Sequence, residues 1–148
     1  MKAIENVEVL LVEDSPHDAE MTMRALKKGN FLNKLYWVQD GVEALDFVHC
    51  TGVYAEREPE HRLKLMILDL KMPRLDGLDV LREMKSDERT RSIPIVIMTS
   101  SNQDRDIMES YRLGVNGYVT KPVQFAAFTE AVACIGMYWL LVNESRTS

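Results

Sequence analysis

Acidic side chains end two of the apolar segments of this sequence. Asp69 closes the apolar run at 65–68, and a loop that contains proline and glycine follows it. Glu13 and Asp14 come directly after the first apolar run of the chain. Carboxylate oxygens are the ligands that Mg²⁺ prefers, and a carboxylate can also act as a nucleophile. The three acids therefore indicate a divalent-metal site suited to phosphoryl chemistry.

A threonine and a lysine end two further apolar segments. Thr99 is the last residue of the run at 94–99, and Lys121 follows the short run at 117–120. An ammonium group can pair with phosphoryl oxygens, and a hydroxyl group can donate a hydrogen bond to one of them. Since parallel strands end at one edge of a sheet, we expect both side chains to lie beside the three carboxylates.

Apolar runs alternate with amphipathic helical segments along the chain, and this alternation predicts an α/β fold. Strands are expected at 7–12, 34–38, 65–69, 94–99 and 117–120. Helices are expected to begin near residues 16, 42, 77, 104 and 124, and the last of them to extend to about residue 142. The order predicts a doubly wound, five-stranded parallel sheet with helices on both faces.

Composition is typical of one soluble globular domain, which we expect to span residues 1–148. The chain is 46% hydrophobic and 28% charged and has a net charge of −5, which argues against binding to nucleic acid. No segment has the ~20 apolar residues of a membrane helix, and the N-terminus lacks a secretory signal. Cys50 and Cys134 form no metal-binding pair, so two reduced thiols in a cytoplasmic protein are favoured.

The sequence resembles the receiver domain of two-component response regulators over nearly its whole length. The matching segments are Val-Glu-Asp at 12–14, Leu-Asp-Leu-Lys-Met-Pro at 68–73, Asp-Gly at 76–77, Pro-Ile-Val-Ile-Met-Thr-Ser at 94–100 and Tyr-Val-Thr-Lys-Pro at 118–122. The resemblance implies a flavodoxin-like (βα)5 receiver fold. It also implies a signalling protein that catalyses only its own phosphotransfer and dephosphorylation, rather than an enzyme that turns over a substrate.

The resemblance further implies a phosphoacceptor and a metal site. Asp69 would accept a phosphoryl group from the phosphohistidine of a histidine kinase. Asp14 would bind Mg²⁺ directly, and Glu13 would bind it largely through a water molecule. Asp69 itself and the backbone carbonyl of Lys71 would complete the protein ligands of the metal.

A switch is implied by the same resemblance. Lys121 would pair with the oxygens of the acyl phosphate, and Thr99 would donate its hydroxyl group to one of them. The movement of Thr99 towards the phosphoryl group would let Tyr118 swing inward. Receivers usually have a cis peptide bond before the proline that corresponds to Pro122, and an X–Pro bond permits that isomer at modest cost.

After Pro122 only one helix is expected, so we expect no output domain and an output that depends on a partner. The final helix has one apolar stripe that suits the core and a second on another side, which predicts an interface. The two stripes are Phe128, Val132, Ile135, Trp139 and Val142, and Cys134, Met137, Tyr138 and Leu141. A homodimer through the face of the fourth helix, fifth strand and fifth helix is therefore predicted; an unknown downstream protein is the alternative.

A long charged connection at 51–64 precedes the third strand, and a solvated surface loop is the favoured interpretation. This connection and the ending at 135–140 are most similar to the small receivers that partner bacterial, cyanobacterial-type phytochrome kinases. A phytochrome kinase is therefore the expected partner within the class of histidine kinases.

Two other functions are compatible with parts of the pattern. One is a phosphatase with an aspartyl nucleophile, but such enzymes typically carry a second acid two residues further on, where this chain has Lys71. The other is a binding module with the receiver shape that works without phosphorylation. All residues needed for the chemistry are present, so the sequence favours a competent receiver.

Overall fold

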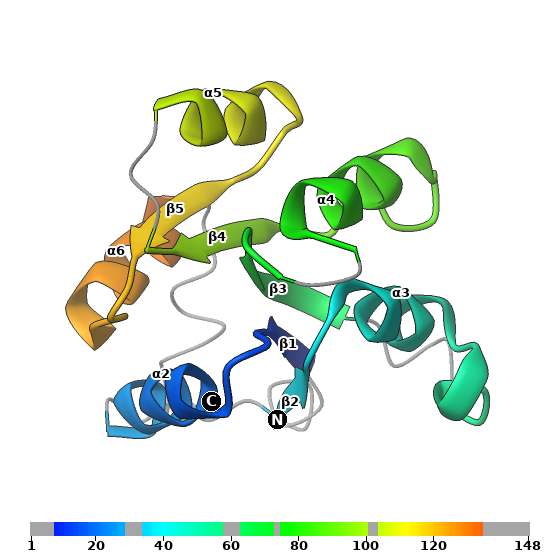
Figure 1. The fold of residues 1–148 in the computed structure, drawn as a ribbon, viewed down its shortest axis with the longest axis horizontal. Helices are drawn as coiled ribbons and strands as arrows, with labels where there is room; N and C mark the ends of the chain where they lie inside the picture. The colour runs from blue at the N-terminus through cyan, green and yellow to red at the C-terminus, as the bar shows by residue number, and fades with distance from the viewer. Residues whose placement is uncertain (1–7, 29–33, 58–62, 73–74, 101–103, 135–148) are drawn as a thin grey trace, which may run out of the picture.

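The computed structural model describes residues 8–28, 34–57, 63–72, 75–100 and 104–134. Its strands are β1 (Glu8–Val12), β2 (Lys34–Val38), β3 (Leu63–Asp69), β4 (Ile95–Thr99) and β5 (Gly117–Thr120). Its helices are α2 (Pro16–Lys28), α3 (Gly41–His49), the 3-10 helix η1 (Gly52–Tyr54), α4 (Gly77–Ser86), α5 (Asp104–Arg112) and α6 (Phe125–Cys134). All strand pairs are parallel, in the order β2-β1-β3-β4-β5, and the predicted α/β fold is confirmed (Figure 1).

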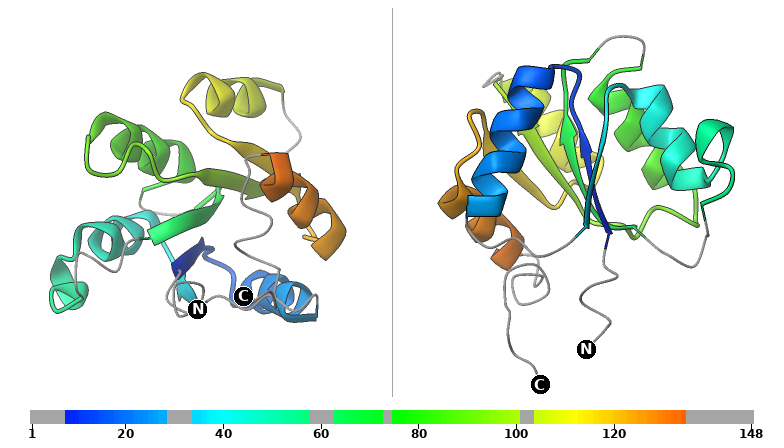
Figure 2. Two further views of the ribbon diagram at one scale, coloured as in Figure 1. Left: turned by 180° about the vertical axis from the view of Figure 1, so that it is seen from behind. Right: turned by 90° about the horizontal axis from the view of Figure 1, so that it is seen from below.

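Helices cover both faces of the sheet. Helices α2 and α6 lie on one face, and α3, α4 and α5 lie on the other (Figure 2). Successive residues of a strand point to opposite faces, so Leu11 belongs to the core under α2 and α6, while Leu10 and Val12 belong to the core under α3 and α4. Burial on both faces explains why the central strands read as unbroken apolar runs.

Two helices begin at side-chain caps. Ser15 Oγ accepts a hydrogen bond from the backbone N–H of Asp18 at 3.2 Å, and Pro16 occupies the first helical position of α2. Asp40 Oδ1 accepts from the backbone N–H of Glu43 at 2.8 Å at the start of α3. The cap at Ser15 starts α2 directly after β1, which places the first turn of this helix at the edge of the sheet that carries the acids.

The connection after α3 is mostly exposed at its described residues, as the predicted solvated loop requires, but Tyr54 and Arg57 pack against the protein. The Arg57 guanidinium lies 4.0 Å from the centre of the Phe47 ring and donates a hydrogen bond to the Phe47 carbonyl oxygen. The Tyr54 ring meets the same Phe47 ring edge to face, with 5.1 Å between the ring centres. An arginine can lie flat on an aromatic ring while it keeps its hydrogen bonds, which explains how a charged segment folds back onto the core. Residues 58–62 lie outside the described part of the chain.

Tyr54 provides a test of this packing. Its hydroxyl group donates a hydrogen bond to Glu43 Oε2 at 2.7 Å, and burial together with the Glu43 carboxylate raises the pKa of Tyr54 to about 12. Because this pKa lies above the ordinary value of about 10, the neutral phenol contributes stability below pH ~10 that is lost as the pH rises towards 12. We expect Tyr54→Phe to remove the latest phenolate step from an ultraviolet absorbance titration, whereas Tyr111→Phe leaves that step in place. A late step that survives in Tyr54→Phe would contradict the contact with Glu43.

Gly77 is required by the close approach of two backbone segments. Its N–H donates to the Leu70 carbonyl oxygen at 2.9 Å, and a Cβ at this position would collide with the Asp69 carbonyl oxygen and lie 2.6 Å from Leu70 Cα. We expect Gly77→Ala to lower the free energy of unfolding by about 2 kcal/mol, because the backbone after β3 must move to admit the methyl group. Urea denaturation measures this loss; an unchanged midpoint would contradict the close approach.

The final helix is described only as far as Cys134. Phe128 of α6 is fully buried in the core that α2 and α6 form with the sheet, as the first apolar stripe predicts. The extension to residue 142 and the second stripe from Met137 onward lie outside the described residues, and the side chain of Cys134 does too. Within the described part of the chain, no helix is long and apolar enough to span a bilayer.

Candidate functional site

The carboxyl ends of β1 and β3 bring the three predicted acids together. Val12 pairs with Leu68 in the sheet, so Asp69 at the end of β3 lies beside Glu13 and Asp14, which follow β1. One carboxylate oxygen from each acid lies within 4.8 Å of the others. Glu13 and Asp69 are buried, whereas Asp14 is exposed to solvent. Of these three acids, Asp14 is therefore the one that solvent reaches.

Lys121 supplies the positive charge of this site. It follows β5, and its Nζ lies 2.6 Å from Glu13 Oε1, 2.9 Å from Asp69 Oδ2 and 3.1 Å from Asp18 Oδ2. The ammonium group has three N–H donors and three carboxylates around it. Only 13% of the Lys121 side chain is exposed, so solvent screens these pairs weakly.

Burial shifts the protonation equilibria of the site. Removal from water raises the pKa of Glu13 to about 7, and the Asp69 charge adds to this effect, while Lys121 and the N–H of Ser15 oppose it. Burial alone would lower the pKa of Lys121, but its pairs with Glu13, Asp69 and Asp18 outweigh that effect and raise the pKa. Lys121 therefore keeps its charge at neutral pH and balances part of the surrounding negative charge.

The position of Glu13 is held from two sides. The indole Nε1 of Trp37 donates to the Glu13 carbonyl oxygen at 2.8 Å, and the Glu13 N–H donates to the Val38 carbonyl oxygen at 3.0 Å. The N–H of Ser15 donates to Glu13 Oε2 at 3.1 Å. Trp37 was not predicted to belong to the site, because an aromatic residue in a strand is typical of the core.

Asp18 is the second residue of the site that the sequence analysis missed. It lies in the first turn of α2, and its carboxylate reaches Lys121 across the end of the sheet. The available signal was Ser-Pro-His-Asp at 15–18, a cap followed by an acid in the first helical turn. That pattern indicates the start of a helix, and the contact with Lys121 requires the tertiary structure.

The remaining predicted residues lie at the same edge. The Lys71 N–H donates to Asp69 Oδ1 at 3.2 Å, and the Lys71 side chain is exposed. Thr99 ends β4 and pairs with Thr120, the residue before Lys121. The peptide bond between Lys121 and Pro122 is cis, the isomer that the resemblance implies.

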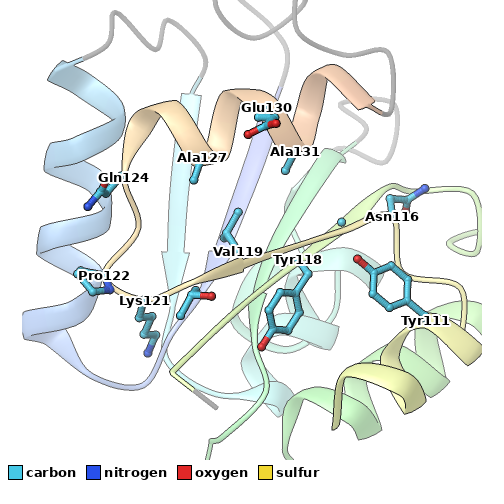
Figure 3. A pocket seen from close by; sticks show the side chains of 12 residues that line it. Tyr111, Asn116, Tyr118, Val119, Lys121, Pro122, Gln124, Ala127, Glu130 and Ala131 are labelled. Carbon is cyan, nitrogen blue, oxygen red and sulfur yellow. The ribbon is translucent and has the colours of Figure 1, made fainter. Parts of the chain in front are cut away.

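A cavity of about 640 Å³ adjoins this site on the face formed by α5, β5 and α6. Figure 3 shows Lys121 and Tyr111 at opposite ends of the cavity, with Tyr118 between them. Tyr118 is half-buried against the core under α3 and α4. Lys121 therefore belongs both to the carboxylate cluster and to the lining of a surface cavity.

The donor set fits a small, hard divalent cation. Mg²⁺ prefers carboxylate and carbonyl oxygens and keeps part of its water shell, and one exposed acid beside two buried ones allows both. Glu13, Asp14 and Asp69 are the described side chains that would hold it. A single ammonium group cannot balance these acids and Asp18, so a further cation would lower their mutual repulsion.

This arrangement of acids and a lysine on a five-stranded parallel sheet agrees with the sequence comparison. A model of the response regulator receiver domain matches residues 9–133. The chain belongs to the response regulator receiver family.

Three individual response regulators are similar to this chain over most of its length. Response regulator Rcp1 of Synechocystis sp. is 36% identical over 132 residues, which cover 89% of this chain and 88% of Rcp1. The structure of the bacteriophytochrome response regulator AtBRR is similar with a TM-score of 0.84 and 44% identity, covering 93% of this chain and 98% of AtBRR. The bacteriophytochrome response regulator RtBRR is also similar, with a TM-score of 0.84 and 42% identity, covering 95% of this chain and 84% of RtBRR.

Proposed function

We propose that this chain is a phosphorelay response regulator whose Asp69 accepts a phosphoryl group from a histidine kinase. The observation that carries the proposal is the position of Asp69. Its buried carboxylate ends β3, lies 2.9 Å from the Lys121 ammonium and shares a cluster with Glu13 and Asp14. A nucleophilic carboxylate beside a fixed cation and a metal-binding set is what phosphoryl transfer requires.

In the transfer, an Asp69 oxygen attacks phosphorus, and an O–P bond forms as the P–N bond of the phosphohistidine breaks. The bonding electrons return to the imidazole nitrogen, which regains a proton from solvent. Lys121 pairs with the incoming phosphoryl oxygens, and the N–H of Lys71 holds the second oxygen of Asp69. Glu13, Asp14, Asp69 and the Lys71 carbonyl oxygen would hold Mg²⁺, and its charge would lower the repulsion between the phosphoryl group and the acids.

We propose that the signal leaves through the face of α5, β5 and α6. Lys121 links the acid cluster to the cavity of this face, and Tyr118 lies on β5, the strand that Lys121 follows. Thr99 and Tyr118 are the proposed switch pair: Thr99 moves towards the phosphoryl group, and Tyr118 turns inward. The charge of the phosphoryl group then selects one of two packing arrangements.

Intact-mass spectrometry after incubation with acetyl phosphate tests the phosphotransfer. We expect one added phosphoryl group that requires Mg²⁺ and is removed by hydroxylamine, the reagent that cleaves acyl phosphates. Binding of beryllofluoride, a phosphoryl mimic, tests the same site if hydrolysis is fast. A protein that neither takes the phosphoryl group nor binds beryllofluoride would act without phosphorylation. Turnover of many equivalents of a phosphomonoester would instead indicate a phosphatase.

The partner that we propose is a phytochrome histidine kinase. The support is the likeness to AtBRR and RtBRR, both described as bacteriophytochrome response regulators, and to Rcp1. We expect faster phosphotransfer from a phosphorylated bacteriophytochrome kinase than from a chemotaxis kinase at equal concentration, with Asp69→Asn as the blank. Equal rates from both kinases would contradict this choice of partner.

We also propose that the face of α5, β5 and α6 forms a homodimer. Met108 and Tyr111 on α5 are 70% and 51% exposed, which is high for large apolar side chains, and Tyr111 also lines the cavity. Light scattering at low and high protein concentration, with and without beryllofluoride, tests the assembly. Met108→Glu should weaken the dimer, whereas Val53→Glu on the remote η1 should not. A monomer under all of these conditions would contradict the proposal.

A further inference from the structure

The contact between Asp18 and Lys121 joins the first turn of α2 to the segment that follows β5. Asp18 Oδ2 lies 3.1 Å from Lys121 Nζ, with the geometry of a hydrogen bond between charged groups. The Asp18 side chain is 39% exposed, while that of Lys121 is 13% exposed. The cap by Ser15 Oγ on the Asp18 N–H fixes the turn that carries this carboxylate.

Asp18 differs from the other two partners of Lys121. Glu13 and Asp69 belong to the carboxylate cluster that can hold a metal ion, and Asp18 does not belong to it. A divalent cation bound to the cluster would compete with the ammonium group for Glu13 and Asp69, since like charges at short range repel. Asp18 is then the one of the three carboxylates that is still free to pair with Lys121.

We propose that Asp18 is a positioning residue that keeps the Lys121 ammonium beside Asp69 when metal occupies the other carboxylates. The inference rests on the proposed phosphotransfer. Asp18 is neither a proposed metal ligand nor the phosphoacceptor, and its role is to orient the side chain of Lys121. An ammonium group that Asp18 already holds in place need not be ordered at the moment of transfer. Loss of the Asp18 carboxylate should therefore slow the reaction.

A purely structural role for Asp18 is the alternative. An acid in the first turn of a helix is favoured by the helix dipole, and this effect needs no contact with Lys121. The two roles differ in their dependence on Lys121, and a double-mutant cycle measures that dependence.

The first measurement is the rate of phosphorylation by acetyl phosphate at saturating Mg²⁺ for wild type, Asp18→Asn and Glu20→Gln. Glu20 lies on the same helix and pairs with Arg24 on the surface, so its substitution removes the same charge away from the site. We expect Asp18→Asn to be about five times slower and to bind beryllofluoride about five times more weakly, the loss typical of one hydrogen bond in a partly exposed position. Glu20→Gln should match wild type, and Asp18→Glu should recover part of the rate. An Asp18→Asn rate equal to that of wild type would overturn the proposal.

The second measurement places Asp18→Asn in a Lys121→Ala background. If Asp18 acts through Lys121, the added substitution should change the residual rate by less than twofold. A further fivefold loss would show that Asp18 acts independently of Lys121 and would overturn the inference.

A third measurement does not depend on phosphorylation. With ¹³C-labelled lysine and Mg²⁺ alone, we expect the Lys121 ε-methylene to be ordered in wild type and mobile in Asp18→Asn by NMR relaxation. Equal order in both would overturn the positioning role. If wild type took no phosphoryl group while this NMR difference persisted, the proposed function would fail and the hold of Asp18 on Lys121 would stand.

Discussion

We expect Asp69→Asn to abolish the phosphoryl adduct, which is the largest effect on activity that we predict for any substitution. An amide oxygen is a far weaker nucleophile than a carboxylate. Glu13 and Asp14 follow β1 and do not end β3, so we expect neither of them to replace Asp69 as the phosphoacceptor. Intact mass after acetyl phosphate and Mg²⁺ should show one phosphoryl group on wild type and none on the variant. Asp79→Asn, on the surface of α4 beside Arg82, is the matched control and should still be phosphorylated. An adduct on the same tryptic peptide of Asp69→Asn would count against the assignment.

The same substitution should leave the fold intact and stabilise it in the absence of Mg²⁺. Burial is the main cause of the raised pKa of Glu13, and the Asp69 charge adds to it through repulsion between the two carboxylates. Loss of that charge relieves the repulsion, although it also removes one partner of Lys121. We expect a net gain of about 1 kcal/mol in the free energy of unfolding, measured by urea denaturation. A loss of stability would mean that the pair with Lys121 outweighs the repulsion.

Lys121→Ala is the substitution with the largest expected effect on stability. It removes the one cation that contacts Glu13, Asp69 and Asp18 among the described residues. Buried carboxylates without a counter-ion are costly, so we expect the ion-free variant to lose about 3 kcal/mol of unfolding free energy. Mg²⁺ should still bind and should raise the unfolding midpoint more in the variant than in wild type, because the metal takes over part of the missing charge.

The control for this experiment is Lys64→Ala, since Lys64 is exposed on β3. It should change stability by no more than a few tenths of a kcal/mol. Activation should weaken in Lys121→Ala, seen as a smaller response of the partner or the dimer to phosphorylation. If the response to phosphorylation and the Mg²⁺ dependence of stability were unchanged, Lys121 would be an ordinary surface lysine.

The sequence alone determined the sheet and the edge at which the acids gather. Four strands of the structure differ from their predicted bounds by at most one residue, and β3 begins at Leu63, two residues earlier than expected. The reason is physical: a strand buried on both faces must be apolar throughout, and few other structures tolerate such a run. Because parallel strands share their direction, a polar residue after each run identifies the site edge without any coordinates. Glu13, Asp14, Asp69, Thr99 and Lys121 were found in this way.

The tertiary structure decided the contacts that depend on how a helix or a loop is oriented. Asp18 reads as part of a helix start, and only the angle of α2 across the sheet brings it to Lys121. Trp37 reads as core, and only the pairing of β1 with β2 places its indole at the Glu13 carbonyl oxygen. Local patterns carry the period of an element and the position of its ends. They do not determine how a side chain on one helix or strand is oriented towards a neighbouring helix or strand. That orientation decides which charged groups come into contact.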